Sequence, residues 1–414
     1  MLENIRSFNP LLIVFLYAFF LSACTTAAPT PQPTATIIAV TLGPTSTNPP
    51  SAPSPSPVRP TATLIPIQPI SDEDWSRGPV DAPITLLVYS DFQCPFCADL
   101  EHVLGQLRET HRNDFRFVFR HFPLLTIHDK ASLAGQAAEA AGVQGEFWVM
   151  HDYLFEHQSE WGSLSISEFN NWLIGATDEL GLDEATMKAD LQSRGREADM
   201  ETYFLQGVQS GLTGTPFIFI NGTWMRIDPT LVNMEAMIRL ELLKLQQYET
   251  APSMSIEEDG QYFARIRLET GDVVIELFPK SAPNNVNNFI FLANSGWFDE
   301  NPFFRVVDEI LVETGDPSGT GLGHPGYSLM DEIDPDLNFD QSGIVAMSSS
   351  GPDTNGSQFF ISLSPLPMLN GSRTIVGRVV EGLELLQGIP PHEPSSDLLI
   401  NSADLIQTIA IEVR

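Results

Sequence analysis

Apolar and polar positions follow three different patterns along the chain. Residues 11–21 form an unbroken apolar run, LLIVFLYAFFL. The run is too short for an ordinary transmembrane helix and lies at the very start, which is typical of a signal-peptide core. From residue 25 to residue 70, Pro, Thr, Ser and Ala dominate and Arg59 carries the only charge. Such a composition cannot build a packed core and predicts a semi-extended tether.

Structured sequence begins near Ser71 with a mixture of strand and helix patterns. Three apolar, β-branched or aromatic runs predict strands at Ile84–Ser90, Phe115–His121 and Phe217–Ile220. A helical pattern follows Cys97 through Leu107, and another closes the region from Thr230 to Tyr248. Residues 130–211 are rich in Ala, Glu and Leu and predict several helices, with Gly162, Gly175 and Gly181 as helix breakers. We therefore expect an α/β domain over residues 71–250.

The pattern changes again near Ala251, where short strands and turns replace leucine-rich helices. Residues 263–268 and 272–278 flank Glu269-Thr270-Gly271 and predict a β-hairpin. Glycine recurs through the rest of the chain, which favours an all-β domain with one or two helices over residues 251–414. The chain as a whole is predicted to be multidomain, as its 414 residues also suggest.

Charge and cysteine content narrow the possible functions. The chain carries 21 basic and 53 acidic residues, a formal net charge of −32. Such an acidic surface repels phosphate backbones, so we expect no nucleic-acid partner. Three cysteines are too few for a disulfide scaffold.

Cys94 and Cys97 form a C-x-x-C motif at a predicted junction between a strand and a helix. The helix dipole favours a thiolate on the first sulfur, and Cys97, one turn later, can resolve a mixed disulfide. Two other interpretations are a structural zinc site, for which no second cysteine pair exists, and a structural disulfide closing a very short loop.

Asp91-Phe-Gln-Cys-Pro-Phe-Cys97 together with Thr215-Pro216 resembles the DsbA-like branch of the thioredoxin superfamily. This resemblance implies a thioredoxin fold with a helical insertion, matched by residues 130–211. It implies that Cys94 attacks, that Cys97 resolves, and that a cis peptide at Thr215-Pro216 receives the substrate chain. Phe96 stands where strong oxidants of that family carry histidine, which argues against strong oxidising power.

Leu21-Ser22-Ala23-Cys24 resembles the lipobox of bacterial lipoproteins. The resemblance implies a signal peptide over residues 1–23, lipidation of Cys24, and a tether over residues 24–70 that attaches the protein to a membrane outside the cytoplasm. The alternative is an ordinary signal peptide, or an uncleaved anchor, with an incidental cysteine.

The second domain contains several motifs in a fixed order. They are Phe303-Phe-Arg-Val-Val307, Gly315-Asp-Pro317, Gly351-Pro-Asp-Thr-Asn-Gly-Ser-Gln-Phe-Phe-Ile361 and Leu369-Asn-Gly371. Arg305 interrupts an apolar strand, and a guanidinium at such a position requires a structural or functional explanation. Gln358 and Phe360 are two residues apart on a predicted strand and share one face.

These motifs, with Thr270-Gly-Asp272, resemble a cyclophilin across residues 262–413. The resemblance implies a closed eight-stranded β-barrel with two capping helices and peptidyl-prolyl cis–trans isomerase activity without cofactor or metal. It assigns Arg305 to the proline nitrogen, Gln358 to a neighbouring carbonyl and Ser349 to the substrate backbone. The proline ring would lie against four apolar residues: Phe360, Ile310, Leu311 and Leu369.

Several positions depart from the usual cyclophilin pattern. Ile310 replaces a pocket phenylalanine, Met368 a tryptophan and Glu313 a glutamine, while Phe304 and Arg373 occupy positions that are often histidine. Glu313 could pair with Arg305 or could point to solvent. The alternative function is a cyclophilin fold that only binds chains.

Together these features predict a membrane-anchored, extracytoplasmic protein-folding factor. Its partners would be unfolded or partly folded exported polypeptides and a redox partner for Cys94 and Cys97. The alternative is a non-catalytic chaperone or binding lipoprotein that uses both folds as interaction modules. We expect no metal site, because His151 and His157 flank an aromatic helix and fit core or surface positions better than metal ligands.

Overall fold

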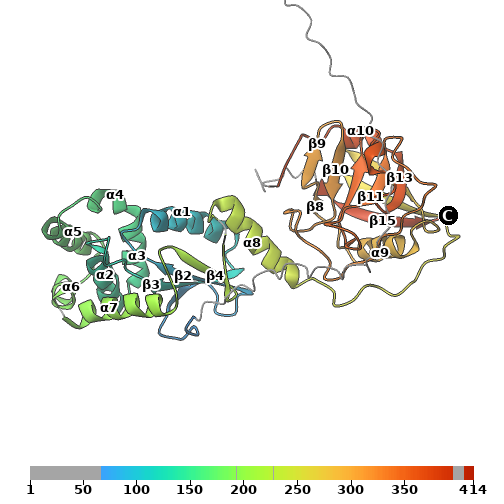
Figure 1. Cartoon of the computed structure of the whole chain (residues 1–414). Coiled ribbons are helices and arrows are strands. Elements are labelled where there is room, and N and C mark those ends of the chain that lie inside the picture. Colours follow the sequence, from blue (N-terminus) through green and yellow to red (C-terminus); the bar gives the residue numbers. More distant parts are fainter. Residues whose placement is uncertain (1–66, 193, 227, 395–404) are drawn as a thin grey trace, which may run out of the picture. The chain divides into compact units, whose positions relative to one another are not determined.

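The computed structural model describes residues 67–192, 194–226, 228–394 and 405–414 (Figure 1). Cys24, the apolar run at residues 11–21 and most of the expected tether lie outside the described residues. Within the described part of the chain, no helix is both long and apolar enough to cross a membrane.

A five-stranded mixed sheet forms the centre of the first domain. Its strands are β1 (Trp75–Arg77), β2 (Ile84–Ser90), β3 (Phe115–His121), β4 (Phe217–Ile220) and β5 (Thr223–Trp224). Their order is β1-β3-β2-β4-β5; β2 and β3 are parallel and the other pairs are antiparallel. The three longer strands occupy the predicted residues, because each is an apolar run that the sheet buries.

Eight helices are described in this domain. They are α1 (Pro95–Thr110), α2 (Ala131–Val143), α3 (Phe147–Glu156), α4 (Gln158–Trp161), α5 (Ile166–Glu179), α6 (Glu184–Leu191), α7 (Arg194–Gln209) and α8 (Leu231–Lys244). Six of them, α2 to α7, lie between β3 and β4 in the chain and form the predicted helical insertion.

The expected helix break at Gly175 is wrong, because α5 continues through it. A capping box between Ser165 and Glu168 starts this helix, and Phe169, Leu173 and Thr177 bury one of its faces. A single glycine costs a helix roughly 1 kcal/mol, too little to end one that is capped and packed in this way.

Both faces of the first sheet are covered. Ile84, Leu86 and Val88 on β2 join the main core with α1 and the insertion helices. Leu87 and Tyr89 point to the other face, where a smaller cluster includes Phe122 and Phe219. This burial on both sides explains why Leu86, Leu87 and Val88 are consecutive apolar residues in the central strand.

The second domain is built on an eight-stranded antiparallel sheet in the order β15-β6-β7-β13-β11-β12-β10-β9. The strands are β6 (Tyr262–Leu268), β7 (Gly271–Leu277), β9 (Arg305–Val307), β10 (Leu311–Thr314), β11 (Ile344–Met347), β12 (Phe359–Ser362), β13 (Ile375–Glu381) and β15 (Thr408–Val413). Two further strands, β8 (Asn301–Pro302) and β14 (Leu405–Ile406), pair with each other. The predicted hairpin is β6 and β7.

This sheet is curled, but its described strand pairs do not close it into a barrel. Its order ends at β15 and β9, which do not pair within the described residues, so a closed eight-stranded barrel stays a prediction. Helix α9 (Pro283–Asn294) and the one-turn α10 (Leu383–Leu386) accompany the sheet. Alternating residues such as Val306, Val312 and Ile361 build the main core together with α9, while the next residue along each strand faces the opposite way.

Candidate active sites

The two thiols lie where β2 gives way to α1. Cys94 is the N-cap residue of α1, and Pro95 occupies the first helical position, where its missing N–H is not needed. Cys94 is 3% exposed and Cys97 is fully buried, and both are free thiols. The sequence therefore places the two sulfurs one helical turn apart, with the first at the positive end of the helix dipole.

Cys94 lies against the loop before β4. Its Sγ donates to the carbonyl oxygen of Thr215 at 3.4 Å, and the Thr215-Pro216 peptide is cis, as the DsbA-like resemblance implied. Hydrogen bonding from the Cys97 thiol, aided by the Thr215 side chain, lowers the pKa of Cys94 to about 6 in spite of burial. Burial and the neighbouring Cys94 raise the pKa of Cys97 well above its usual value. One thiol is thus ready to ionise near neutral pH while the other holds its proton.

A loop distant in sequence fastens the turn that carries Cys94. The buried carboxylate of Asp91 accepts a hydrogen bond from the Leu124 backbone N–H at 2.8 Å and lies 2.7 Å from Nδ1 of His128. This contact with Asp91 is the main reason that the pKa of His128 is raised, and the Cys94 thiolate contributes to the same shift. His128 therefore brings a positive charge toward Cys94 from outside the C-x-x-C motif.

Backbone carbonyls beside the motif are also held by a side chain. Nε2 of Gln158 on α4 donates to the carbonyl oxygens of Phe92 at 2.7 Å and Cys94 at 2.9 Å. Neither Gln158 nor His128 was predicted, because no local motif marks them. The sequence offers only a general signal: Gln158 lies in the expected insertion, and His128 lies in the loop just before it.

A cavity of about 530 Å³ adjoins the thiols. It lies between the start of α1 and the start of α8, and its lining includes Phe96, Leu100, Val103, Thr215, Pro216 and Leu231. Phe96 is 68% exposed although it is fully apolar. An apolar hollow beside a sulfur and a cis-proline can receive an extended polypeptide segment.

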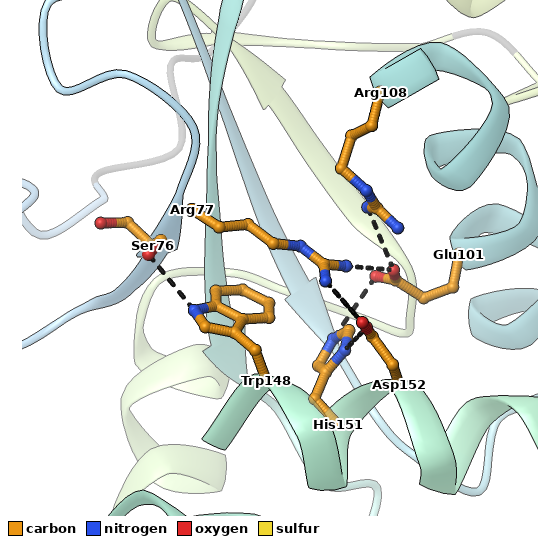
Figure 2. Close-up of polar contacts among 7 residues, drawn as sticks. All are labelled: Ser76, Arg77, Glu101, Arg108, Trp148, His151 and Asp152. Atoms are coloured by element: carbon orange, nitrogen blue, oxygen red, sulfur yellow. Dashed lines mark hydrogen bonds and ion pairs between the residues drawn. The ribbon is translucent and has the colours of Figure 1, made fainter. Parts of the chain in front are cut away.

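An ionic cluster lies in the same domain, with Glu101 and His151 buried and Asp152 exposed (Figure 2). Arg77 binds Asp152 on α3 through two contacts of 2.8 and 2.9 Å and Glu101 on α1 at 3.4 Å, and Arg108 lies 3.8 Å from Glu101. His151 is fully buried and its Nδ1 lies 2.8 Å from Asp152. Burial lowers the pKa of His151, so the two carboxylates are balanced by two guanidinium groups.

Glu101, His151 and Asp152 are near enough to hold a metal ion, but their surroundings do not favour one. Their ligand atoms lie within 4.8 Å of one another. Both carboxylates already neutralise arginines, and the guanidinium of Arg77 also stacks on Trp148 at 4.3 Å. A divalent cation would add uncompensated positive charge, so we interpret the cluster as an ion-pair network joining α1 and α3 to β1.

The residues that the cyclophilin resemblance singled out lie in a row across four neighbouring strands. Arg305 on β9 pairs with Glu313 on β10, Glu313 with Phe360 on β12, and Phe360 with Ala346 on β11. Residues directly opposite one another share a face, so the row lies on the side of the sheet away from the main core. Gln358 precedes β12 by one residue and joins the same face two positions before Phe360.

A buried apolar cluster occupies one end of this row. Phe360 stacks on the buried Phe339 at 5.8 Å, and Ala346, Leu366 and Ile375 complete the cluster, with Leu311 and Leu369 packed against it. Ile310, the fourth residue expected at the proline ring, is 42% exposed, and Met368, which replaces a tryptophan, is 75% exposed. Neither belongs to this cluster, although each adjoins one of its residues in sequence, Leu311 and Leu369.

Two carboxylates hold the guanidinium of Arg305. Nη1 lies 3.4 Å from Glu313, and Nε lies 3.2 Å from Glu393, a residue that sequence reasoning missed. Glu313 is 8% exposed and also accepts a hydrogen bond from the Ser348 hydroxyl. The expected pairing between Glu313 and Arg305 is therefore present, and Glu313 does not point to solvent.

A cavity of about 450 Å³ lies beside Arg305 and Gln358. Nε2 of Gln358 donates to the carbonyl oxygens of Gly321 at 3.1 Å and Gly323 at 2.7 Å, which fixes the loop that forms one wall. Ser349 also lines the cavity, and its hydroxyl accepts from Arg373 at 2.7 Å. The amide nitrogen of Gln358 is thus engaged within the domain, and Oε1 is the atom with which it can meet a substrate.

The Gly-Asp-Pro motif sets the shape of that wall. The fully buried Asp316 accepts hydrogen bonds from the backbone N–H groups of Ser318 at 2.8 Å and Gly323 at 2.9 Å. Gly315 has φ +94°, and a Cβ there would lie 2.2 Å from the carbonyl oxygen of Ser357. The indole N–H of Trp297 donates to the carbonyl of Gly315 at 3.2 Å. This turn therefore positions the strand end that carries Gln358.

The fold and this row of side chains define a cyclophilin-like domain. Residues 263–410 match the family described as cyclophilin type peptidyl-prolyl cis-trans isomerase. Human peptidyl-prolyl cis-trans isomerase-like 1 is 40% identical over 147 residues, which cover 34% of this chain and 89% of that protein. The peptidyl-prolyl cis-trans isomerase ppi1 of Schizosaccharomyces pombe is 40% identical over 154 residues, covering 36% of this chain and 99% of that protein. Through this domain the chain belongs to the cyclophilin-type peptidyl-prolyl cis-trans isomerase family.

The first domain is thioredoxin-like. Residues 71–239 match the family described as thioredoxin. Among solved structures, α-DsbA1 of Wolbachia pipientis is 17% identical, with a TM-score of 0.39 and coverage of 44% of this chain and 100% of that chain. The predicted order, a thioredoxin-like domain followed by a cyclophilin-type domain, is confirmed.

Proposed function

We propose that the chain is a protein-folding factor whose second domain isomerises X-Pro peptide bonds. The observation that carries this proposal is the row in which Arg305, Glu313 and Phe360 with its apolar cluster share the face of the sheet away from the main core. A proline ring on the apolar cluster would bring its nitrogen toward the guanidinium. The partners would be unfolded or partly folded exported polypeptides.

Catalysis follows from the electronic structure of the bond. The barrier of roughly 18–20 kcal/mol arises from the partial double bond between carbon and nitrogen. Rotation breaks that resonance and leaves a lone pair on the proline nitrogen, to which Arg305 donates a hydrogen bond. Because the lone pair is available only in the twisted state, this contact stabilises the transition state more than the ground state. Oε1 of Gln358 would accept an N–H of the substrate backbone and hold the segment in place.

The test is isomerisation of a short Ala-Pro peptide by the purified chain, followed by NMR exchange so that no protease is needed. We expect catalysis by the wild type. Binding of the peptide without catalysis would support the alternative of a chain-binding module, which the two carboxylates on Arg305 favour.

We propose that the first domain exchanges thiols and disulfides through Cys94 and Cys97. The Cys94 thiolate attacks one sulfur of a client disulfide, forming a mixed disulfide and releasing the other client sulfur as a thiolate. Cys97 loses its proton and attacks the Cys94 sulfur, which leaves a Cys94–Cys97 disulfide and a client dithiol. The reverse sequence oxidises the client, and a protein redox partner that restores the starting state of the pair sets the direction.

The cavity at Thr215 and Pro216 supports a polypeptide client for this reaction, since its largely apolar lining includes Thr215, whose carbonyl contacts the Cys94 sulfur. The test is reduction of insulin disulfides or oxidation of a reduced model peptide by the purified chain in glutathione buffers of known ratio. Activity in neither direction would contradict the proposal.

We also propose that the chain acts outside the cytoplasm, attached to a membrane by a lipid on Cys24. The support is the apolar run before Cys24 and the Pro- and Thr-rich segment after it. Two folding reactions that are slow without catalysis, roughly 10–100 s for proline isomerisation and seconds to hours for disulfide reshuffling, would then act on the same exported chains. Cys24→Ala should move the protein from the membrane fraction to the soluble fraction. Unchanged membrane retention would contradict lipid attachment.

A further inference from the structure

A short segment near the C-terminus lies along the edge strand that carries Arg305. His392 forms a two-way backbone bridge with Val306, with N···O distances of 2.8 and 3.1 Å. Val306 faces the main core, so the next residue after His392, Glu393, is on the same face as Arg305. Its carboxylate lies 3.2 Å from Nε of Arg305, and Pro394 lines the 450 Å³ cavity.

The cavity and the apolar cluster are separate places for two parts of a substrate. Arg305 and Gln358 line the cavity, but Phe360, Leu311 and Leu369 of the apolar cluster do not. Two of the three substituents on a proline nitrogen belong to the ring, and the third is the carbonyl carbon of the preceding residue. With the ring on the apolar cluster and the nitrogen at Arg305, the residue before the proline is directed toward the cavity.

Two carboxylates stand at this cavity beside the guanidinium of Arg305. Glu313 lines the cavity together with Arg305, and Glu393 precedes the lining residue Pro394. Serine and threonine hydroxyls and the backbone around Gly321 make up much of the remaining wall. Two further titratable or charged side chains lie around the cavity. His324 lines it and accepts a hydrogen bond from the Gly326 N–H. Arg373 does not line it but binds the lining residue Ser349.

The charge of the whole domain acts in the same direction. Residues 251–414 contain seven basic and 24 acidic residues. An approaching cationic segment is attracted from a distance, and an anionic segment is repelled. Long-range attraction alone would not depend on one residue, whereas contact with a fixed carboxylate would.

We infer that Glu393, held in place by the His392–Val306 bridge, makes this domain select substrates with a basic side chain immediately before the proline. An ammonium or guanidinium group that enters the cavity past Pro394 pairs with Glu393 at its edge and with Glu313 in its wall. That pairing draws the carboxylates away from Arg305 and releases its N–H groups for the proline nitrogen. An acidic side chain is repelled and leaves Arg305 held. This inference rests on the proposed isomerase activity of the domain.

The experiment compares three peptides that differ only in the residue before proline, Lys, Ala or Glu, using the purified full chain and NMR exchange at low salt. We expect kcat/KM to be about tenfold higher for Lys than for Glu, because a partly exposed carboxylate attracts the first side chain and repels the second. Glu393→Gln should bring the ratio most of the way to one, and Glu393→Lys should reverse it. Glu381→Gln removes an exposed acidic charge elsewhere on the domain and should keep the wild-type ratio.

A wild-type ratio near one, or a ratio that Glu393→Gln leaves unchanged, would overturn the inference. An equal loss in Glu393→Gln and Glu381→Gln would also overturn it, since overall charge would then be the cause. If none of the three peptides is isomerised, the proposed isomerase activity is wrong, but the selectivity can still be tested by binding. Dissociation constants for the same peptides then decide the selectivity, which again requires Lys to bind more tightly than Glu through Glu393.

Discussion

The two candidate sites are assembled in opposite ways. The thiol site lies within Asp91–Cys97 and has its main distant partner at Thr215. The isomerase site collects side chains from β9, β10 and β12 and from the segment at Glu393, and strand register alone aligns them. A local site is specified by a helix start and a short spacing, whereas an assembled site is specified by the whole sheet. Loss of the Cys94 sulfur should therefore abolish thiol–disulfide exchange. Changes in charge around Arg305 should raise or lower the rate of isomerisation.

The largest effect is expected at the attacking sulfur. Cys94→Ser should abolish disulfide exchange and leave Ala-Pro isomerisation unchanged, because each site contains its own chemistry. Cys97→Ala should instead accumulate mixed disulfides with clients, since the resolving sulfur is gone. Insulin reduction and non-reducing gels measure both effects. If Cys94→Ser rather than Cys97→Ala accumulates mixed disulfides, Cys97 is the attacking sulfur and Cys94 the resolving one.

Removal of the guanidinium should reduce isomerisation by roughly 10²- to 10³-fold, the usual scale for one donor aimed at a developing charge. In Arg305→Ala the loss should appear in kcat more than in KM, since the lone pair exists only in the twisted bond. The isomerisation rate of an Ala-Pro peptide measures it, with Arg378→Ala as a control on an exposed arginine of the same domain. Equal losses in both variants would show that general charge, and not this donor, matters.

The ion-pair network of Figure 2 tests whether the domains are independent in stability. Glu101→Ala leaves Arg77 and Arg108 without a buried partner and should cost the first domain about 3 kcal/mol in free energy of unfolding. Differential scanning calorimetry should show one transition moved to lower temperature. Ala-Pro isomerisation at 25 °C should not change, and a parallel loss there would contradict independence.

The pKa of Cys94, about 6, sets a pH dependence for the first site. Alkylation of reduced protein by iodoacetamide should rise as pH passes 6 and then level off, because the thiolate predominates above that pKa and is lost below it. Cys97 should stay unlabelled at neutral pH, as its pKa is raised. His128→Gln removes the positive charge paired with Asp91 and should slow labelling at pH 6 by roughly two- to fivefold. If the pH midpoint of alkylation in the wild type lies near the pKa of an ordinary free thiol, the lowered pKa of Cys94 is contradicted.

The smallest effect is expected from the buried carboxylate of the second site. Glu313→Gln frees Arg305 from one of its two partners and should raise kcat/KM on an Ala-Pro peptide roughly two- to fivefold. Thermal unfolding of the same variant controls for the lost hydrogen bond with Ser348. A lower rate at unchanged stability would mean that Glu313 assists the reaction.

The sequence predicted best what is decided locally. The strands at Ile84–Ser90 and Phe115–His121 and the turn at Glu269 were found because apolar runs and turn residues act over a few positions. The pair of Arg305 and Glu313 could be anticipated because Arg305 lies in one of the motifs and Glu313 stands where the cyclophilin resemblance implies a glutamine.

What the sequence could not predict depends on packing between distant segments. His128 reaches Asp91 only through the fold of the loop between β3 and α2, and Glu393 reaches Arg305 only through a bridge to the edge strand. No periodicity marks either residue. Gly175 shows the opposite error, since an unfavourable local propensity was outweighed by a capped and packed helix.

The indole of Trp297 has a practical use that follows from its hydrogen bond to Gly315. The chain has six tryptophans, and Trp297 is the only one after residue 250. Biosynthetic labelling with 5-fluorotryptophan would give the isomerase domain a single fluorine resonance. Because that indole is bonded to the turn that supports Gln358, the chemical shift would report substrate binding at one site while the thiol chemistry of the other proceeds in the same tube.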